Sequence, residues 1–541
     1  MERRSFLTTA SAALAFPFIA CSRKAESGVP PGFLQDAGLD LGHRLRARAA
    51  FPAPTETRKI PVLIVGAGIA GLSAGWRLQK RGFRDFQIVE LADRSGGNSR
   101  FTDQRENPVS AHPLGAHYLP LPSRESVFVR ELLADLGAIE GDPQIDRPIY
   151  DERKLCHAPQ ERLYRNGIWQ DGLIPQQGLA RQERDEIRRF LERMAEFRAA
   201  TDHAGRRAFA IPAELSSPEP RWRQLDRISM ANWLQNEGYR SPALRWYVDY
   251  ACRDDFGTLL ADTSAWAGIH YFACRNGQAA NAPGDAVLTA PEGNGWIVRA
   301  LSERLTTQLS TDAMVFQVQV EKQHVTVDLW LPKENRSVRY EVQHLVWAAP
   351  LFQLPFIATD LPTEVTATAR AGTYAPWLVA NLTLSEPPQN GAGASLAWDN
   401  VPYGSQALGY VVATHQNYRM APGPTVITWY HALAHAAPAE ARKTLSNTTR
   451  EQWAASILGE LGHMHHDIRA LTQRLDVFRH GHAMIRPTPG ALWGATRAAL
   501  CQAESSSRLH LAHSDVSGLS LFEEASYRGV IAADKLLLRL A

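Results

Sequence analysis

A glycine-rich turn and a following acid are the residues with the clearest chemistry in this sequence. Gly66, Gly68 and Gly71 give the spacing G-x-G-x-x-G inside VLIVGAGIAGLSAGWRLQKRGFRDFQIVE, which ends at Glu90. In such a turn the first glycine permits a tight bend, the second lets the backbone approach a pyrophosphate, and the third allows helix and strand to pack closely. A carboxylate at the position of Glu90 accepts hydrogen bonds from both hydroxyls of a ribose. The spacing therefore predicts a dinucleotide site.

A strand, a helix and a second strand must position these residues. Residues 62–65 and 86–89 are short apolar runs, and residues 72–79 have helical composition. The N-terminus of this helix offers the unpaired N–H groups of Ile69 and Ala70 to the anion. This βαβ unit fits NAD and FAD equally, because both carry an unphosphorylated adenosine ribose.

A second glycine pair decides between the two dinucleotides. LADRSGGNSR follows Glu90 and gives a second segment whose flexible backbone and basic groups can contact the pyrophosphate. Here the chain resembles the flavin-containing amine oxidase superfamily, which includes phytoene-desaturase-like and protoporphyrinogen-oxidase-like enzymes and carries E-x(5)-GG-x-x-[RS] after its first βαβ unit. The resemblance implies FAD. It adds the following cofactor contacts: Gly96, Gly97, Asn98, Ser99 and Arg100.

The resemblance continues to the end of the chain. LGAHYLPLP is similar to the family's segment that passes the flavin ring, and PEGNGWIVRALSERL to its glycine turn and returning helix. MVFQVQV resembles a strand that reaches adenine, VWAAP an apolar strand that ends in proline, and LHLAHSDVSGLSLFEEASYRGV the closing motif. In that motif an acid contacts the ribityl or pyrophosphate region, and a helix N-terminus points at the flavin. The residues that the resemblance assigns to FAD in these segments are Gly115, Ala116, His117, Val315, Asp515, Phe522 and Ala525.

The resemblance also implies the architecture. We expect an α/β fold with a Rossmann-type FAD-binding domain that is discontinuous in sequence, and a substrate domain with a mixed sheet and a helical cap. There is no second nucleotide-binding βαβ unit, so electrons should come from an organic substrate. The expected segments are a signal peptide at 1–21, a linker at 22–58, the FAD-binding domain at 59–130, 291–350 and 476–541, and the substrate domain at 131–290 and 351–475.

Candidate substrate-binding residues gather in YVDYACRDDFGTLLADTSAWAGIHYFACRNG. Aromatic walls with a few charges suit a cleft that positions an amine or a flat apolar substrate. Asp254, Asp255 and His270 are candidates for binding a cationic substrate. The alternative is that the two acids only form ion pairs with Arg253.

Two histidines lie in RHGHAMIRPTPG, where family members place a strand and loop beside the flavin. His480 or His482 is a candidate acid or base near flavin N5, and the alternative is a hydrogen-bonded loop histidine. Flavin amine oxidases commonly carry a lysine near N5, whereas residues 374–384 contain none, which weakens the case for amine oxidation. The closing motif has no cysteine, so we expect FAD to be held non-covalently. HMHHD at 463–467 has no second ligand cluster, and no metal site is predicted.

Composition and charge exclude one class of function. The 541 residues carry 58 basic and 56 acidic side chains, a net charge of +2. Binding of nucleic acid needs a concentrated basic face, and we expect no nucleic-acid partner. The five cysteines are far apart and lack CxxC spacing, which indicates neither a zinc site nor a disulfide framework.

The first residues predict export. Arg3 and Arg4 in RRSFL, before an apolar run at 6–20, resemble a twin-arginine signal, and FIAC before residue 22 resembles a lipobox. The apolar run is too short to span a bilayer. We expect the twin-arginine machinery to deliver the folded protein to the periplasm. The sequence leaves open whether Cys21 becomes a lipid anchor, and residues 22–58 are interpreted as a tether or a surface arm.

These observations predict an FAD-dependent oxidoreductase that passes a hydride from a small organic molecule to flavin N5 and gives electrons to oxygen or a quinone. An amine or polyamine is the first expectation for the substrate. One alternative is a desaturase or dehydrogenase of a more apolar compound. Another is a membrane-anchored electron-transfer flavoprotein that turns over no small molecule.

Overall fold

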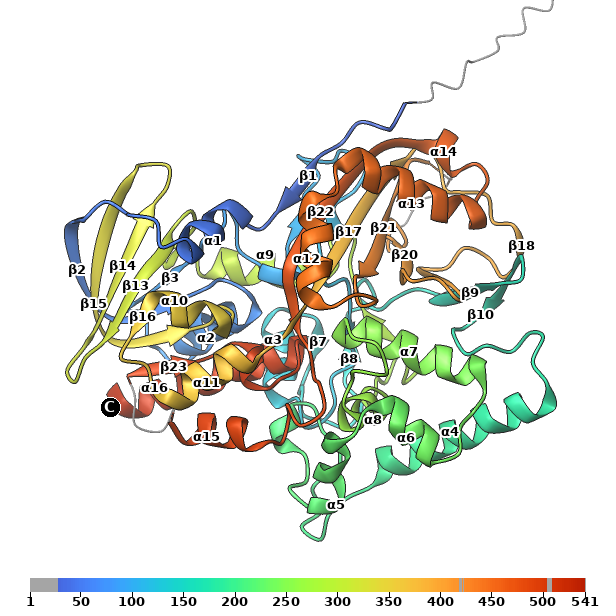
Figure 1. The fold of residues 1–541 in the computed structure, drawn as a ribbon, viewed down its shortest axis with the longest axis horizontal. Coiled ribbons are helices and arrows are strands. Elements are labelled where there is room, and N and C mark those ends of the chain that lie inside the picture. The colour runs from blue at the N-terminus through green and yellow to red at the C-terminus, as the bar shows by residue number, and fades with distance from the viewer. Residues whose placement is uncertain (1–27, 418–420, 422, 504–507, 541) are drawn as a thin grey trace, which may run out of the picture.

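Two large β-sheets, three two-stranded sheets and a group of helices make up the described part of the chain, which comprises residues 28–417, 421, 423–503 and 508–540 of a computed structural model. In Figure 1 one sheet lies on the left, the other at the upper right, and helices lie below the second sheet. The α/β fold class predicted from the sequence is confirmed. The predicted export signal and Cys21 fall outside the described residues.

The first sheet, here called the nucleotide sheet, has eight strands among the described residues. They are β2 (Pro54–Val65), β3 (Phe86–Val89), β12 (Leu309–Ser310), β13 (Met314–Val320), β14 (Val325–Leu331), β15 (Arg336–Trp347), β16 (Ala358–Thr359) and β23 (Leu509–Leu511). The centre is parallel, because β2 runs between β3 and β15, β12 pairs with β3, and β23 pairs with the end of β15. Parallel strands are buried on both faces, which is why their apolar runs were recognisable in the sequence.

Helices cover this parallel centre. α2 (Ile69–Lys80) leaves the glycine turn, and α16 (Phe522–Leu540) packs beside it. A Cβ atom on Gly529 would lie 2.1 Å from the carbonyl oxygen of Ala70, so the two helix backbones approach closely only because residue 529 has no side chain. This contact places the start of α16 next to the glycine turn.

The second sheet, here called the substrate sheet, has nine strands among the described residues. In spatial order they are β1 (Leu34–Asp36), β22 (Thr472–Ile485), β17 (Tyr374–Leu384), β21 (Thr425–Ala432), β20 (Gly409–Val412), β19 (Asp399–Pro402), β9 (Glu161–Arg165), β10 (Ile168–Asp171) and β18 (Ala392–Gly393). Two strands cross the segment boundaries expected from the sequence, since β22 joins this sheet and β16 joins the nucleotide sheet. Sheet membership depends on pairing between distant residues, which a single sequence does not encode locally.

A helical cap lies beside the substrate sheet, formed by α4 (Arg181–Ala199), α6 (Met230–Asn236), α7 (Pro242–Phe256) and α8 (Ala265–Ala273). The apolar stripe of α4 is buried in this cap, as expected for a packing surface. Ser229 caps α6, because its hydroxyl accepts the Asn232 N–H at 3.2 Å. The cap therefore holds α7, which carries the candidate acids, in a fixed position.

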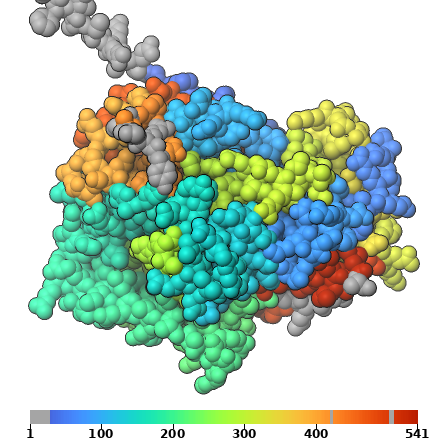
Figure 2. Space-filling model, turned by 180° about the vertical axis from the view of Figure 1, so that it is seen from behind, coloured from blue at the N-terminus to red at the C-terminus, as the bar shows by residue number. Residues whose placement is uncertain are grey.

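The remaining helices surround the two sheets. They are α1 (Leu39–Arg46), α3 (Val127–Asp135), α5 (Pro220–Arg223), α9 (Gly295–Arg304), α10 (Leu354–Ile357), α11 (Thr363–Ala371), α12 (Pro438–Asn447), α13 (Arg450–Met464), α14 (Ile468–Leu471) and α15 (Ala495–Ala503). Seen from behind, the yellow-green segment around α9 crosses the molecule next to blue segments of the first quarter of the chain (Figure 2). No helix in the described ranges is long and apolar enough to cross a membrane.

Candidate cofactor and substrate site

The first glycine turn lies at the end of β2, where the backbone leaves the sheet. Gly66 has φ +100°, and a Cβ atom there would meet the backbone of Ala348 at 3.0 Å. A Cβ atom on Gly71 would lie 1.8 Å from the carbonyl oxygen of Gly66. Because α2 begins at Ile69, the first N–H groups of the helix, including that of Ala70, have no partner within it and remain for an anion.

Glu90 is fixed by the turn that it follows. Its carboxylate accepts the Ala67 N–H at 2.7 Å and the Ala92 N–H at 3.0 Å. Burial raises the pKa of Glu90, and the two backbone N–H groups oppose that shift. Each carboxylate oxygen retains a second lone pair, which is the capacity needed to accept ribose hydroxyls.

The second glycine pair lies directly against the first. Gly68 and Gly96 form a parallel bridge, and the Gly96 N–H donates to the Ala67 carbonyl at 2.8 Å. Gly97 starts a short 3-10 turn that continues through Asn98 and ends at Ser99. The two glycine segments, which are separated in sequence by α2 and β3, thus form one backbone surface.

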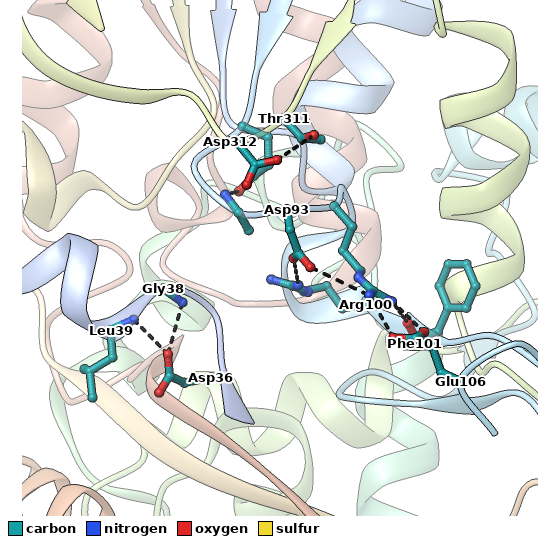
Figure 3. A network of polar contacts seen from close by, with 12 residues as sticks. Asp36, Gly38, Leu39, Asp93, Arg100, Phe101, Glu106, Thr311 and Asp312 are labelled. Carbon is teal, nitrogen blue, oxygen red and sulfur yellow. Dashed lines mark hydrogen bonds and ion pairs between the residues drawn. The ribbon is translucent and has the colours of Figure 1, made fainter. Parts of the chain in front are cut away.

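Arg100 follows the second glycine pair and adds a side-chain donor to this backbone surface. Its Nη2 donates to Asp93 at 2.7 Å, as Figure 3 shows, and its guanidinium lies 5.7 Å from the ring centre of Phe478. Its Nε is buried and has no hydrogen-bond partner among the described atoms. A buried donor without an acceptor next to a glycine cradle fits a phosphate-bearing cofactor.

The segment predicted to pass the flavin ring is anchored at three successive carbonyls. Gly115 accepts a hydrogen bond from the Tyr430 hydroxyl at 2.9 Å, and Ala116 accepts the Asn294 N–H at 3.1 Å. His117 accepts the Thr289 hydroxyl at 2.7 Å.

The same segment also reaches back to the glycine surface. The Ala116 N–H donates to the Asn98 carbonyl at 2.7 Å, and a Cβ atom on Gly115 would lie 2.2 Å from that oxygen. Three chain segments therefore converge where the sequence predicts the dinucleotide.

Val315 lies near the start of β13, a strand that does not pair with β3 but begins close to Glu90. The Ala313 N–H donates to the Glu90 carbonyl at 2.9 Å, which brings the start of β13 next to the acid. Val315 itself is buried in the core of the nucleotide sheet. Its contact with adenine stays a prediction, and its position beside Glu90 is consistent with it.

Asp515 is buried and connects both sheets. One carboxylate oxygen accepts the Leu351 N–H at 2.9 Å and the Tyr374 hydroxyl at 2.6 Å. The other oxygen lies 3.0 Å from His513 Nδ1, but that nitrogen accepts the Asp515 N–H, so this oxygen has no hydrogen bond among the described atoms. Burial raises the pKa of Asp515, and the opposing contacts with His513, Tyr374 and Leu351 leave it below its usual range.

Phe522 and Ala525 lie in the first turn of α16 and pack against the core of the nucleotide sheet. They are half-buried, and the start of α16 is placed beside the glycine turn by the Gly529 contact described above. Their contact with the flavin stays a prediction.

Aromatic rings gather beside the 115–117 segment. The ring centre of His117 lies 4.5 Å from that of Tyr430 and 5.4 Å from that of Trp398. Tyr118 meets Trp398 edge-on at 5.9 Å. His117 and Tyr118 belong to the flavin segment, whereas Trp398 and Tyr430 come from separate parts of the substrate sheet, so the proximity of these rings was not visible in the sequence.

Asp254 faces this aromatic group, while Asp255 faces away from it. The Tyr118 hydroxyl donates to Asp254 at 3.2 Å. Burial raises the pKa of Asp254 to about 7, and the negative charge of Asp255 adds to the shift. Asp255 pairs with Arg275 at 2.6 Å, and Arg253 pairs with Asp249 at 2.9 Å. The alternative, in which both acids pair only with Arg253, is not what the structure shows, because neighbouring residues on a helix point in different directions.

Asp399 is a third acid at this place and was missed by the sequence reasoning. It lies on β19, next to Trp398, and burial raises its pKa well above the usual range. The charges of Asp254 and Glu161 add to that shift, while a hydrogen bond from Tyr250 opposes it. No motif surrounds Asp399, so only the fold reveals it. Asp254 and Asp399 are here called the acid pair.

The candidate histidines have other partners. His480 Nε2 donates to the Leu114 carbonyl at 2.7 Å, and burial lowers the pKa of His480 to about 4, so the ring is neutral and anchors the flavin segment. His482 is exposed and stacks on Phe352 with ring centres 4.4 Å apart. His270 does not join the acids, because it is fully buried and bonds the Ala210 carbonyl at 2.8 Å.

The strand that lacks the family's lysine lies next to α7. A Cβ atom on Gly257, at the end of α7, would lie 2.5 Å from Trp377 Nε1 on β17. Every residue of β17 is buried. Among the described residues, no group of three or more histidines, cysteines, aspartates or glutamates could hold a metal ion.

The glycine cradle, the fixed Glu90 and the free donor of Arg100 define a dinucleotide-dependent oxidoreductase fold. The family model for flavin containing amine oxidoreductases matches residues 69–537, and the chain belongs to this family. It is therefore a flavin-dependent oxidoreductase, as the sequence predicted. The sequence matches none of the curated proteins with which it was compared.

Solved structures share the fold. Wild-type putrescine oxidase bound to putrescine is similar with a TM-score of 0.65 and 15% identity, over 89% of this chain and 100% of that chain. Cyclohexylamine oxidase from Brevibacterium oxydans IH-35A has a TM-score of 0.63 and 14% identity over the same shares. A CLA-producing fatty acid isomerase from P. acnes has a TM-score of 0.58 and 14% identity, over 89% of this chain and 98% of that chain. At these identities the likeness establishes the fold.

Proposed function

We propose that this protein oxidises an amine, and that a diamine or polyamine suits it best. The observation that carries the proposal is the acid pair, Asp254 and Asp399, half-buried beside the rings of His117, Tyr118 and Trp398. Arg275 offsets the burial of Asp254 only in part, since the pKa of this acid is still raised to about 7, and a bound ammonium group would compensate the remaining cost of its charge. Aromatic faces add cation–π attraction for the same group.

The chain's residues would bind and orient the substrate. FAD, held non-covalently by the glycine cradle and Glu90, supplies N5 as the hydride acceptor. Asp254 in its ionised form attracts the ammonium group, and the Tyr118 hydroxyl holds this carboxylate in place. The aromatic rings would exclude water and hold the substrate so that its donor carbon faces the flavin. We propose oxygen or a quinone as the final electron acceptor.

We further propose that the protein is exported through the twin-arginine pathway and works in the periplasm, either free or anchored by a lipid at Cys21. The support is the residue pattern RRSFL and FIAC at the start of the chain. Export of a folded protein lets the cofactor bind before the membrane is crossed.

The experiment that tests the substrate class is anaerobic bleaching of the flavin band by a panel of monoamines, diamines and polyamines. We expect one amine to bleach the flavin band of the wild type. The ratio of the bleaching rate constant to the apparent dissociation constant of this amine should rise with pH through about 7, where Asp254 ionises. Asp254→Asn should raise the required amine concentration at least tenfold, equivalent to about 1.4 kcal/mol, and remove the rise with pH.

The matched control is Asp262→Asn, because Asp262 is exposed and forms only a surface ion pair with Arg486. It should behave like the wild type. A flavin band that no amine bleaches would refute the proposal, as would an Asp254→Asn protein with unchanged amine kinetics.

The second candidate is a dehydrogenase or desaturase of a more apolar compound. The fully buried β17, which has Trp377 and no lysine, favours it. In that case amines would leave the flavin oxidised, whereas an apolar donor would bleach it.

A further inference from the structure

The N-terminal arm, defined as residues 28–51, crosses from one sheet to the other. Its strand β1 pairs in parallel with β22 of the substrate sheet, and the Asp36 carboxylate pairs with Arg479 at 2.8 Å. At its other end Phe51 stacks on Phe316 of β13, with ring centres 4.6 Å apart. In Figure 1, α1 lies in the region between the two sheets.

Between these ends the arm lies against residues next to the predicted adenosine contacts. A Cβ atom on Gly38 would lie 3.6 Å from the side chain of Leu91, which directly follows Glu90. Phe316, under Phe51, directly follows Val315. Figure 3 shows the Gly38 turn of the arm beside the loop that carries Asp93 and Arg100. The arm thus touches both chain segments that are predicted to enclose the adenosine.

Leu34 and Leu45 pack against the cores of the two sheets, and backbone hydrogen bonds join the arm to β22. None of residues 28–51 is buried. Asp36 ties the turn by accepting the Leu39 N–H at 2.8 Å, and the Arg44 guanidinium lies 4.3 Å above the ring of Trp330. The family match begins at residue 69, so the arm lies outside it. Such a segment can detach without unfolding the sheets.

We propose that the N-terminal arm is part of the cofactor site, where it covers the adenosine end of bound FAD and slows its release. The proposal rests on FAD as the cofactor and is independent of the substrate. FAD leaves only after the arm lifts, so the arm's contacts with the nucleotide sheet add to the barrier for release.

The test uses the full chain with two arm variants. One is the double variant Arg44→Ala/Phe51→Ala, which removes the contacts with Trp330 and Phe316. The other replaces residues 39–46 by a glycine–serine linker of equal length. The matched control is Phe33→Ala, in the same arm but 55% exposed and on the side of the substrate sheet. Far-UV circular dichroism checks that each variant is folded.

Release of FAD after dilution is followed by the rise in flavin fluorescence, and binding of ADP and FMN to the apoprotein by calorimetry. Both arm variants should release FAD about tenfold faster and bind ADP about tenfold more weakly, while FMN, which lacks the adenosine, binds as in the wild type. Phe33→Ala should match the wild type in all three. Unchanged FAD release and ADP affinity would overturn the proposal. Equal weakening of FMN and ADP would also overturn it, because the arm would then support the fold in general.

Discussion

Asp254 should reduce the stability of the protein at neutral and alkaline pH. Its pKa is raised from 3.8 to about 7, mainly by burial, so the folded state disfavours its charge. The penalty is absent below pH 3.8, grows as the pH rises, and levels off once the pH passes 7. At about 1.36 kcal/mol per pKa unit, a shift of roughly 3 units gives a penalty of about 4 kcal/mol at pH 8 and about 2 kcal/mol at pH 5.

Replacing Asp254 by Asn removes the charge and keeps an acceptor for the Tyr118 hydroxyl. We expect Asp254→Asn to stabilise the protein by up to about 4 kcal/mol at pH 8 and by about half as much at pH 5. The measurement is the unfolding midpoint in denaturant at both pH values, without amine. Adding an amine that binds should narrow the difference at pH 8, because the cation stabilises the ionised wild type.

The control is again Asp262→Asn, an exposed position where an ion pair contributes about 0 to 1 kcal/mol and should change little with pH. If Asp254→Asn gains the same stability at pH 5 and pH 8, the gain comes from something other than the buried charge. If it loses stability at pH 8, Asp254 has a favourable partner and the electrostatic reasoning is refuted.

Two further substitutions test the close contacts around the cofactor segments. Gly529→Ala would place a Cβ atom 2.1 Å from the Ala70 carbonyl, so we expect a loss of about 1 to 3 kcal/mol and less bound flavin, measured by thermal unfolding and by absorbance. The control Gly459→Ala, with nothing within 4 Å, should be neutral or stabilising, and equal behaviour of the two would contradict the packing argument. Asp515→Ala leaves the Leu351 N–H and the Tyr374 hydroxyl without an acceptor, which should cost about 1 to 3 kcal/mol for each group in the same unfolding assay. An unchanged midpoint would show that these hydrogen bonds do not stabilise the fold.

The parts that the sequence predicted well are those whose chemistry is local. The turn at Gly66, the short strands around it and the acid at Glu90 follow one another within a single βαβ unit. The role of each residue can therefore be inferred from residues close to it in sequence.

The parts that the sequence did not predict depend on distant segments. Asp399 and Asp254 are separated by many residues, and only the packing of α7 against the substrate sheet brings them together. The sequence left the partner of Asp255 open, and the structure pairs it with Arg275 rather than with its sequence neighbour Arg253. The strand and helix of the N-terminal arm were missed because they are short and pair with residues far along the chain.

The arrangement of charges bears on the choice between the two candidate functions. Arg275 pairs with Asp255 and only partly offsets the burial of Asp254, whose negative charge raises the pKa of Asp399. An apolar substrate would gain nothing from these two half-buried acids and would add to their desolvation cost, while a cation would relieve both. The lysine that is absent from residues 374–384 would lie near flavin N5, so its absence does not alter the charges around Asp254 and Asp399. The electrostatics of the site therefore favour an amine over an apolar compound.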